Sequence, residues 1–381
     1  MGGPSPRIER VSTLELFFDL VFVFTITELT FLLAAEPTVR GLLQVGLLLG
    51  VIWWMYGGYA WLTNAVAVDR LGRRALLLGG MAGFFVLALA VPGAFADPGP
   101  GFGLAYLGVV LVHSALFGRA SSVGVARAMA RITPFNVLAA LCVLGGLWIG
   151  GTTAYVLLGV AIVLEWGTPR AKPVGGFEIG AAHFTERHGL VVIVAIGESI
   201  VGVGLALRDA GFDLGAAATA LVGLALAAGL WFVYFGSDRD RAAEAALAGA
   251  PSDRRPRIAL DAFGTWHLGI LLGIVVLAAG LEHAVEEPFD TVATADALFM
   301  AGGLALYLVC DAGFRGALGL PVAVGRRLVA LAFVAATVPL GLGVAAFAQI
   351  AALVAILPAM LAAEDAAWIP GGRRTARSAA R

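Results

Sequence analysis

Long apolar runs dominate the chain, and most are long enough to form a helix that crosses a bilayer. Roughly 20 apolar residues in a helix span the hydrocarbon core. By that measure the sequence predicts an all-α integral membrane protein with about 12 transmembrane helices, at 13–35, 41–63, 73–95, 102–124, 134–149, 152–168, 186–207, 213–236, 259–281, 292–314, 327–345 and 346–363. The fifth and sixth runs are short and joined by a tight turn, as are the last two.

The basic residues test this arrangement independently of hydropathy. With twelve spans, all but two of the 25 Lys and Arg residues fall on the N-terminal segment, the even-numbered connections or the C-terminal tail; the exceptions are Arg40 and Arg208. The positive-inside rule assigns the basic side to the cytoplasm. We therefore expect both termini to be cytoplasmic.

Composition agrees with this class and excludes others. The chain has 381 residues, 60% of them hydrophobic and 13% charged, with a net charge of −1. A near-neutral charge gives no indication of nucleic-acid binding, whereas the arginine-rich tail favours contact with membrane lipids. We find no metal-ligand spacing, no P-loop and no dinucleotide glycine fingerprint, so no metal and no cofactor are expected.

Segments of the first half recur in the second half in the same order. The clearest match sets "DLVFVFTITEL" over "GLVVIVAIGES", which aligns Glu28 with Glu198. Matches in three further segments follow along the chain. The pattern predicts two parallel six-helix pseudo-repeats with a functional site between them, lined by the first and seventh helices.

This division gives the expected domains. They are a first repeat at 1–168, a cytoplasmic linker at 169–185, a second repeat at 186–363 and a basic cytoplasmic tail at 364–381.

Three carboxylates interrupt the first span. Glu15 and Asp19 are four residues apart and share a helix face, and Glu28 lies near the opposite interface. Ser12 and Glu15 form a capping-box pattern, so Glu15 could serve as a cap or as a partner to an arginine. Asp19 and Glu28 lack that explanation. Because a carboxylate in hydrocarbon costs several kcal/mol unless it faces a cavity or a partner, they indicate an ion pathway or a buried pair.

The seventh span repeats the theme. The stretch "HFTERHG" places Glu186, Arg187 and His188 at one mouth, and Glu198 follows near the middle of the membrane. A structural ion pair of Glu186 with Arg187 or another arginine explains the mouth equally well. Glu198 is the strongest single candidate for function, because it is an acid at membrane depth.

The ninth span adds His267 near one end and Glu282 near the other. A histidine changes charge near neutral pH and can relay a proton, but it can equally be a hydrogen-bonded packing residue. Asp311 and Arg315 on the tenth span are expected to neutralise one another.

The segments "RVSTLELFFDLVFVFTITEL", "HFTERHGLVVIVAIGESIVGV" and "HLGILLGIVVLAAGLE" resemble the signature segments of the bacterial low-temperature-requirement A (LtrA) family. The likeness covers nearly the whole chain. It implies a multi-pass protein of the bacterial cytoplasmic membrane, and it supports as characteristic polar positions Glu15, Asp19, Glu186, Arg187, Glu198, His267 and Glu282.

These observations favour a transporter or channel that moves protons or small cations by means of the carboxylates on helices one and seven. An intramembrane enzyme that uses a protonated carboxyl as general acid on a lipid or isoprenoid is the alternative, and a non-catalytic sensor or assembly protein is a third. Expected partners are membrane lipids and a small ion or small molecule, with a homodimer left open. A carrier needs an aqueous path to Glu198; an enzyme needs an apolar pocket open to lipid.

Overall fold

The computed structural model describes residues 11–65, 71–118, 123–171, 179–210 and 213–368, and every regular element within them is a helix. The long elements are α1 (Thr13–Ala35), α2 (Val39–Ala65), α3 (Leu71–Leu89), α4 (Gly101–Phe117), α5 (Val123–Ile149), α6 (Gly151–Ala171), α7 (Ala181–Ala210), α8 (Leu214–Phe235), α11 (His267–Glu286), α12 (Thr294–Ala317) and α15 (Ala346–Trp368). Shorter elements are η1 (Gly236–Asp238), α9 (Arg239–Gly249), α10 (Arg255–Ala259), η2 (Leu260–Trp266), α13 (Val324–Ala336) and α14 (Val338–Gly343).

Eleven helical stretches of the described residues are long and apolar enough to cross a membrane. The expected span at 102–124 corresponds to α4, which is apolar but has only 17 residues. The expected span at 327–345 is interrupted at Thr337, between α13 and α14. Pro339 lies in the first turn of α14. Proline cannot donate the backbone hydrogen bond that a continuous helix requires.

The predicted start of α1 is confirmed in atomic detail. Ser12 caps the helix: its hydroxyl accepts from the backbone N–H of Glu15 at 3.3 Å, and Glu15 Oε2 accepts from the backbone N–H of Ser12 at 2.9 Å. This reciprocal pair satisfies two N–H groups that a helix terminus leaves free. It also turns the Glu15 side chain back over the first turn.

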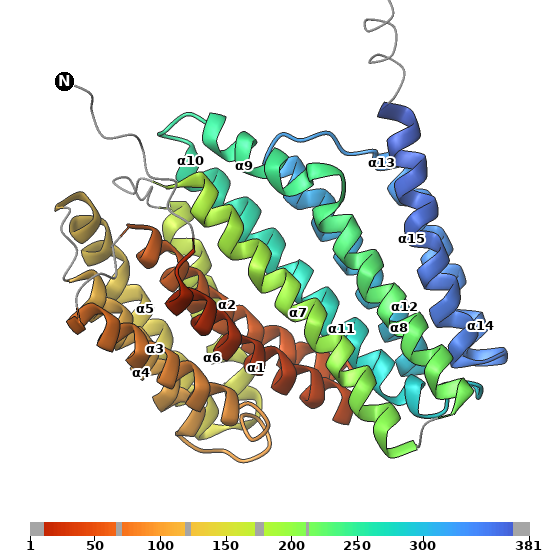
Figure 1. Cartoon of the computed structure of the whole chain (residues 1–381). Helices are drawn as coiled ribbons and strands as arrows, with labels where there is room; N and C mark the ends of the chain where they lie inside the picture. The colour runs from red at the N-terminus through yellow and green to blue at the C-terminus, as the bar shows by residue number, and fades with distance from the viewer. Residues whose placement is uncertain (1–10, 66–70, 119–122, 172–178, 211–212, 369–381) are drawn as a thin grey trace, which may run out of the picture.

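Three helices form the centre of the molecule, α1, α7 and α11, with α2–α6 on one side and α8 and α12–α15 on the other (Figure 1). The end of α15 lies at the same end of the molecule as α9 and α10 (Figure 1). The three central helices run in the same direction, since the first turns of α1 and α7 contact each other and their later turns line one cavity with the later turns of α11.

Glycines allow α11 and α12 to pack backbone against backbone. A Cβ added at Gly273 would lie 2.7 Å from the backbone nitrogen of Tyr307, and one at Gly280 would lie 2.7 Å from that of Met300. On α12, a Cβ at Gly303 would overlap the backbone of Leu277. Small residues drive close helix association in membranes, where apolar side chains gain little by leaving lipid. This packing fixes α11 as a rigid wall for the site.

Candidate functional site

Arg187 on α7 is the centre of a buried ion-pair cluster at the start of α1. The residue is fully buried in the described structure. Its Nη1 donates to Glu15 Oε1 at 3.2 Å and to the hydroxyl of Thr63, and its Nη2 lies 3.5 Å from Asp19 Oδ1. The guanidinium centre also lies 5.3 Å from the ring centroid of Phe18, within cation–π range. One cation therefore neutralises two acids that are themselves buried.

Tyr56 and His183 complete the cluster. The Tyr56 hydroxyl donates to Asp19 Oδ1 at 2.7 Å. His183 Nε2 lies 3.0 Å from Glu15 Oε1, and its Nδ1 lies 3.2 Å from the side-chain amide nitrogen of Asn64. Because that amide nitrogen can only donate, Nδ1 accepts and Nε2 carries the proton toward Glu15. A neutral imidazole therefore satisfies both contacts.

Two further histidines lie next to this cluster. His188 Nδ1 lies 2.8 Å from the carbonyl oxygen of Phe184, one turn earlier on α7. His267 Nδ1 bonds the carbonyl oxygen of Ala262 at 3.0 Å, and its Nε2 accepts from the Tyr234 hydroxyl at 2.7 Å. Ala262 lies in the π-helical segment η2, directly before α11. Both rings are buried, 5.7 Å apart between centroids, with their tautomers fixed by carbonyl acceptors.

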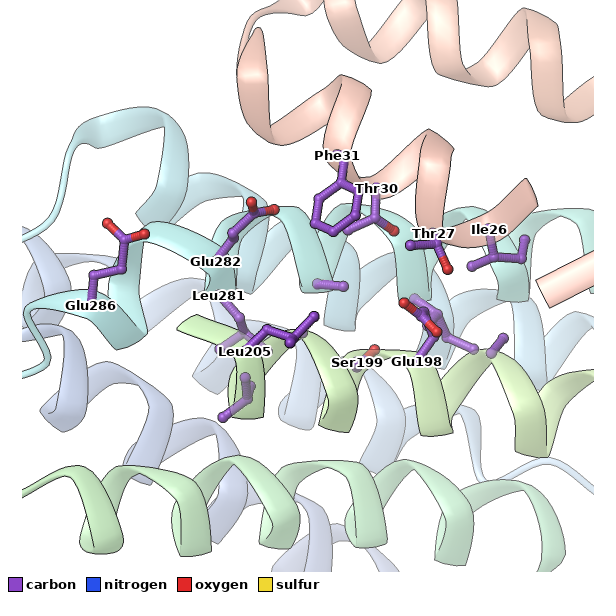
Figure 2. A pocket seen from close by; sticks show the side chains of 15 residues that line it. Ile26, Thr27, Thr30, Phe31, Glu198, Ser199, Leu205, Leu281, Glu282 and Glu286 are labelled. Carbon is purple, nitrogen blue, oxygen red and sulfur yellow. The ribbon is translucent and has the colours of Figure 1, made fainter. Parts of the chain in front are cut away.

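A cavity of about 240 Å³ opens further along the same three helices. Glu198 and Ser199 line it from α7, and Glu282 and Glu286 line it from α11. Figure 2 shows Thr27, Thr30 and Phe31 reaching from α1 toward these acids. The cavity is thus acidic on two walls and carries hydroxyl groups on the third.

The acids of this cavity differ from those of the ion-pair cluster in having no arginine or lysine paired with them among the described residues; His283 follows Glu282 on α11. Neither Glu198 nor Glu282 forms a hydrogen bond or an ion pair with any residue that the structure describes. The hydroxyl of Thr30 is buried and also lacks a hydrogen-bond partner among the described residues. A polar group left in this condition needs water or a ligand. The cavity therefore offers carboxylate and hydroxyl oxygens to water or a polar ligand, although no three acids or histidines among the described residues lie close enough together to hold a metal ion.

Apolar side chains separate the cavity from the ion-pair cluster. Along α1, α7 and α11 the intervening positions include Phe22, Val192 and Ile270, which are at most 1% exposed. These apolar positions lie between the two polar levels, together with the buried hydroxyl of Thr25 on α1.

The structure brings most of the site residues predicted from the sequence into two groups. Glu15, Asp19 and Arg187 meet in the ion-pair cluster, with His188 and His267 beside it. Glu198 and Glu282 both line the cavity, from different helices (Figure 2). The remaining two join neither group: Glu28 does not line the cavity, and Glu186 is exposed and accepts only from the backbone of Val11 at 3.3 Å.

The structure contains a second buried ion network, and the sequence predicted only one of its ion pairs. The expected pair of Asp311 with Arg315 is present at 3.0 Å. Arg327 on α13 also reaches Asp311 at 2.7 Å and Glu364 at 2.9 Å, and Arg239 lies 3.3 Å from Glu364. Arg327, Arg239 and Glu364 lie at the ends of apolar runs, where charge is ordinary, so only their burial distinguishes them.

A buried carboxyl on α6 was also missed. Glu165 is 1% exposed, and Tyr106 donates to its Oε1 at 2.5 Å. Glu165 is the only acid in the span predicted at 152–168, and an acid in an otherwise apolar span was the signal that could have identified it.

Comparison with known proteins identifies the family to which the chain belongs. The family described as Bacterial low temperature requirement A protein (LtrA) matches residues 10–362. The chain belongs to the LtrA family. It is similar to an uncharacterized protein of Rhizobium meliloti (strain 1021), with 27% identity over 314 residues, which are 78% of this chain and 75% of the relative. No solved structure matches it.

Proposed function

We propose that this LtrA membrane protein moves protons or small cations across the bilayer, and that the acidic cavity between α1, α7 and α11 is the binding site on their path. The observation that carries this proposal is the convergence of Glu198 and Glu282 on one cavity without a basic partner among the described residues. Unpaired acids at membrane depth are costly and are retained where they serve a pathway.

The size of the cavity supports a small cargo. Its volume of about 240 Å³ is below the roughly 300–1,000 Å³ of sites that enclose drug-sized molecules. A lipid or isoprenoid substrate would not fit beside Glu198, which argues against the enzyme reading for this cavity. Carboxylate and hydroxyl oxygens match the ligands that hard cations prefer.

The ion-pair cluster then acts as the closed end of the path. Arg187 holds Glu15 and Asp19 in place, and the apolar layer at Phe22 and Val192 blocks movement between the two levels. Transport requires a second conformation in which this layer opens. A rearrangement between the two halves of the chain would supply it.

The orientation is part of the same proposal. With twelve spans, two parallel six-helix pseudo-repeats and both termini in the cytoplasm of a bacterial cell, the cavity faces the outside and the ion-pair cluster faces the cytoplasm. The excess of basic residues on the terminal side of the chain supports this orientation.

Flux measurements in proteoliposomes test the proposal. Under an imposed pH gradient, and separately under gradients of Na⁺ and K⁺, Glu198→Gln should abolish the flux that the unchanged protein supports. The matched control is Glu244→Gln, an exposed acid on α9, which should leave flux unchanged. Equal flux through Glu198→Gln and the unchanged protein for all three ions would refute the proposal.

A further inference from the structure

A second cavity, of about 550 Å³, lies among α2, α4, α5, α6, α7 and the segment 252–264. It is more than twice the volume of the acidic cavity and shares no lining residue with it. Large aromatic side chains form part of its walls, namely Trp53, Trp54, Trp61, Trp166, Phe117 and Phe263. The volume is within the usual range for sites that enclose small molecules.

One buried polar side chain, that of His113, lies among these aromatic residues, with its Nε2 next to Gly58 on α2. His113 on α4 lines the cavity and is 2% exposed. Within ordinary hydrogen-bonding geometry, neither of its ring nitrogens has a partner among the described residues. The ring is held between Tyr59 and Phe117, with centroids 5.2 and 4.9 Å away. Leaving such a group unsatisfied is unfavourable, and a polar atom of a bound molecule would satisfy it.

The mouth of the cavity is basic. Arg170, Arg254 and Arg257 line it together with a single acid, Asp253. Asp261 lies 3.3 Å from Arg170 and 4.0 Å from Arg257. Arg254 is exposed, and its side chain has no ion pair or hydrogen bond with a described residue. The mouth therefore keeps a positive charge available for a ligand.

We propose that this cavity binds a single-chain amphiphile with an anionic head group. The apolar chain lies against the tryptophans, the head lies at Arg254 and Arg257, and His113 bonds a polar atom of the molecule. Charge complementarity at the mouth selects an acid over a neutral lipid, since basic clusters at a membrane face attract anionic head groups. This site is separate from the acidic cavity, although His188 of α7, which lies beside the ion-pair cluster, also lines it.

Glycines on α2 provide a variant that fills the cavity without disturbing the fold. Gly57 lines the cavity, and a Cβ added there meets no atom within 4 Å. Gly57→Leu should therefore occupy the space of the ligand. Gly46 lies on the same helix, also has nothing within 4 Å of an added Cβ, and does not line the cavity. Gly46→Leu is the matched control.

The test uses the full-length protein in lipid nanodiscs, titrated with a brominated long-chain fatty acid that quenches tryptophan fluorescence on contact. The unchanged protein and Gly46→Leu should show the same saturable quenching, which Gly57→Leu should lose. The double variant Arg254→Gln with Arg257→Gln should bind the acid about tenfold more weakly, equivalent to about 1.4 kcal/mol. It should leave binding of the corresponding brominated alcohol unchanged.

Two results would overturn the proposal. One is saturable quenching that persists in Gly57→Leu, because the chain would then lie elsewhere. The other is equal binding of the acid and the alcohol in the unchanged protein, because the basic mouth would then select nothing. Arg241→Gln removes an exposed arginine of α9 that pairs with Asp238 at 2.7 Å, outside the cavity, and controls for a general loss of surface charge.

Discussion

Glu15 on α1 and Arg187 on α7 form an ion pair of 3.2 Å whose side chains are 6% and 1% exposed, respectively. The pair joins positions that are far apart in the chain and holds the first turns of the two central helices together. Asp19 shares the same guanidinium at 3.5 Å. In apolar surroundings these three charges depend on one another, because each would be costly alone.

Removal of the Arg187 cation should therefore destabilise the protein strongly. Arg187→Met leaves Glu15 and Asp19 buried without a counter-charge, and we expect a loss of about 3–5 kcal/mol in the free energy of unfolding. Thermal unfolding of the purified protein in detergent measures it. The control Arg241→Gln removes an arginine whose exposed pair should contribute only about 0–1 kcal/mol.

A double variant shows whether the loss comes from the pair itself. Glu15→Gln combined with Arg187→Met should be less destabilising than the sum of the two single variants, because the second change removes a charge that the first left unpaired. Strict additivity would contradict the assignment of Arg187 as the partner of Glu15.

The contact between α11 and α12 gives a prediction with an internal control. Gly303→Ala introduces a methyl group against the backbone of Leu277 and should destabilise the protein by about 1–3 kcal/mol. Gly302→Ala places the methyl group where nothing lies within 4 Å, so it should be neutral or slightly stabilising. Thermal unfolding compares them, and equal midpoints would show that the helices are not closely packed there.

The hydroxyl of Tyr234 donates a hydrogen bond to His267, one of the two buried histidines beside the ion-pair cluster. Tyr234→Phe removes the donor to His267 Nε2 and leaves a buried acceptor unsatisfied, so we expect a loss of about 1–3 kcal/mol. His267→Phe combined with Tyr234→Phe removes both polar partners and should recover part of that loss. If the double variant is as unstable as the two single losses together, the hydrogen bond is not what stabilises this contact.

Much of the fold could be predicted from the sequence, because apolar runs of bilayer length admit little except helices. The capping box at Ser12 and the pairing of Asp311 with Arg315 are local in sequence and were predictable for that reason. The long-range pairing of Glu15 with Arg187 was not, since spacing within a helix does not specify which helices meet.

The alignment of Glu28 with Glu198 illustrates what a sequence match cannot determine. Thr27, Thr30 and Phe31 line the cavity that contains Glu198, whereas Glu28 does not. One residue along a helix turns the side chain by about 100°, as follows from 3.6 residues per turn. A small difference in helix rotation therefore brings a neighbouring residue to the cavity in place of the aligned acid.

The central claim is that ions pass through the acidic cavity, and covalent blocking tests it most directly. With Cys142 and Cys310 replaced by alanine, Ser199→Cys places a thiol on the cavity wall, and a bulky thiol reagent should stop ion flux into proteoliposomes. The same reagent on Glu244→Cys, exposed on α9, should leave flux intact. Unchanged flux after complete labelling of Ser199→Cys would contradict the account.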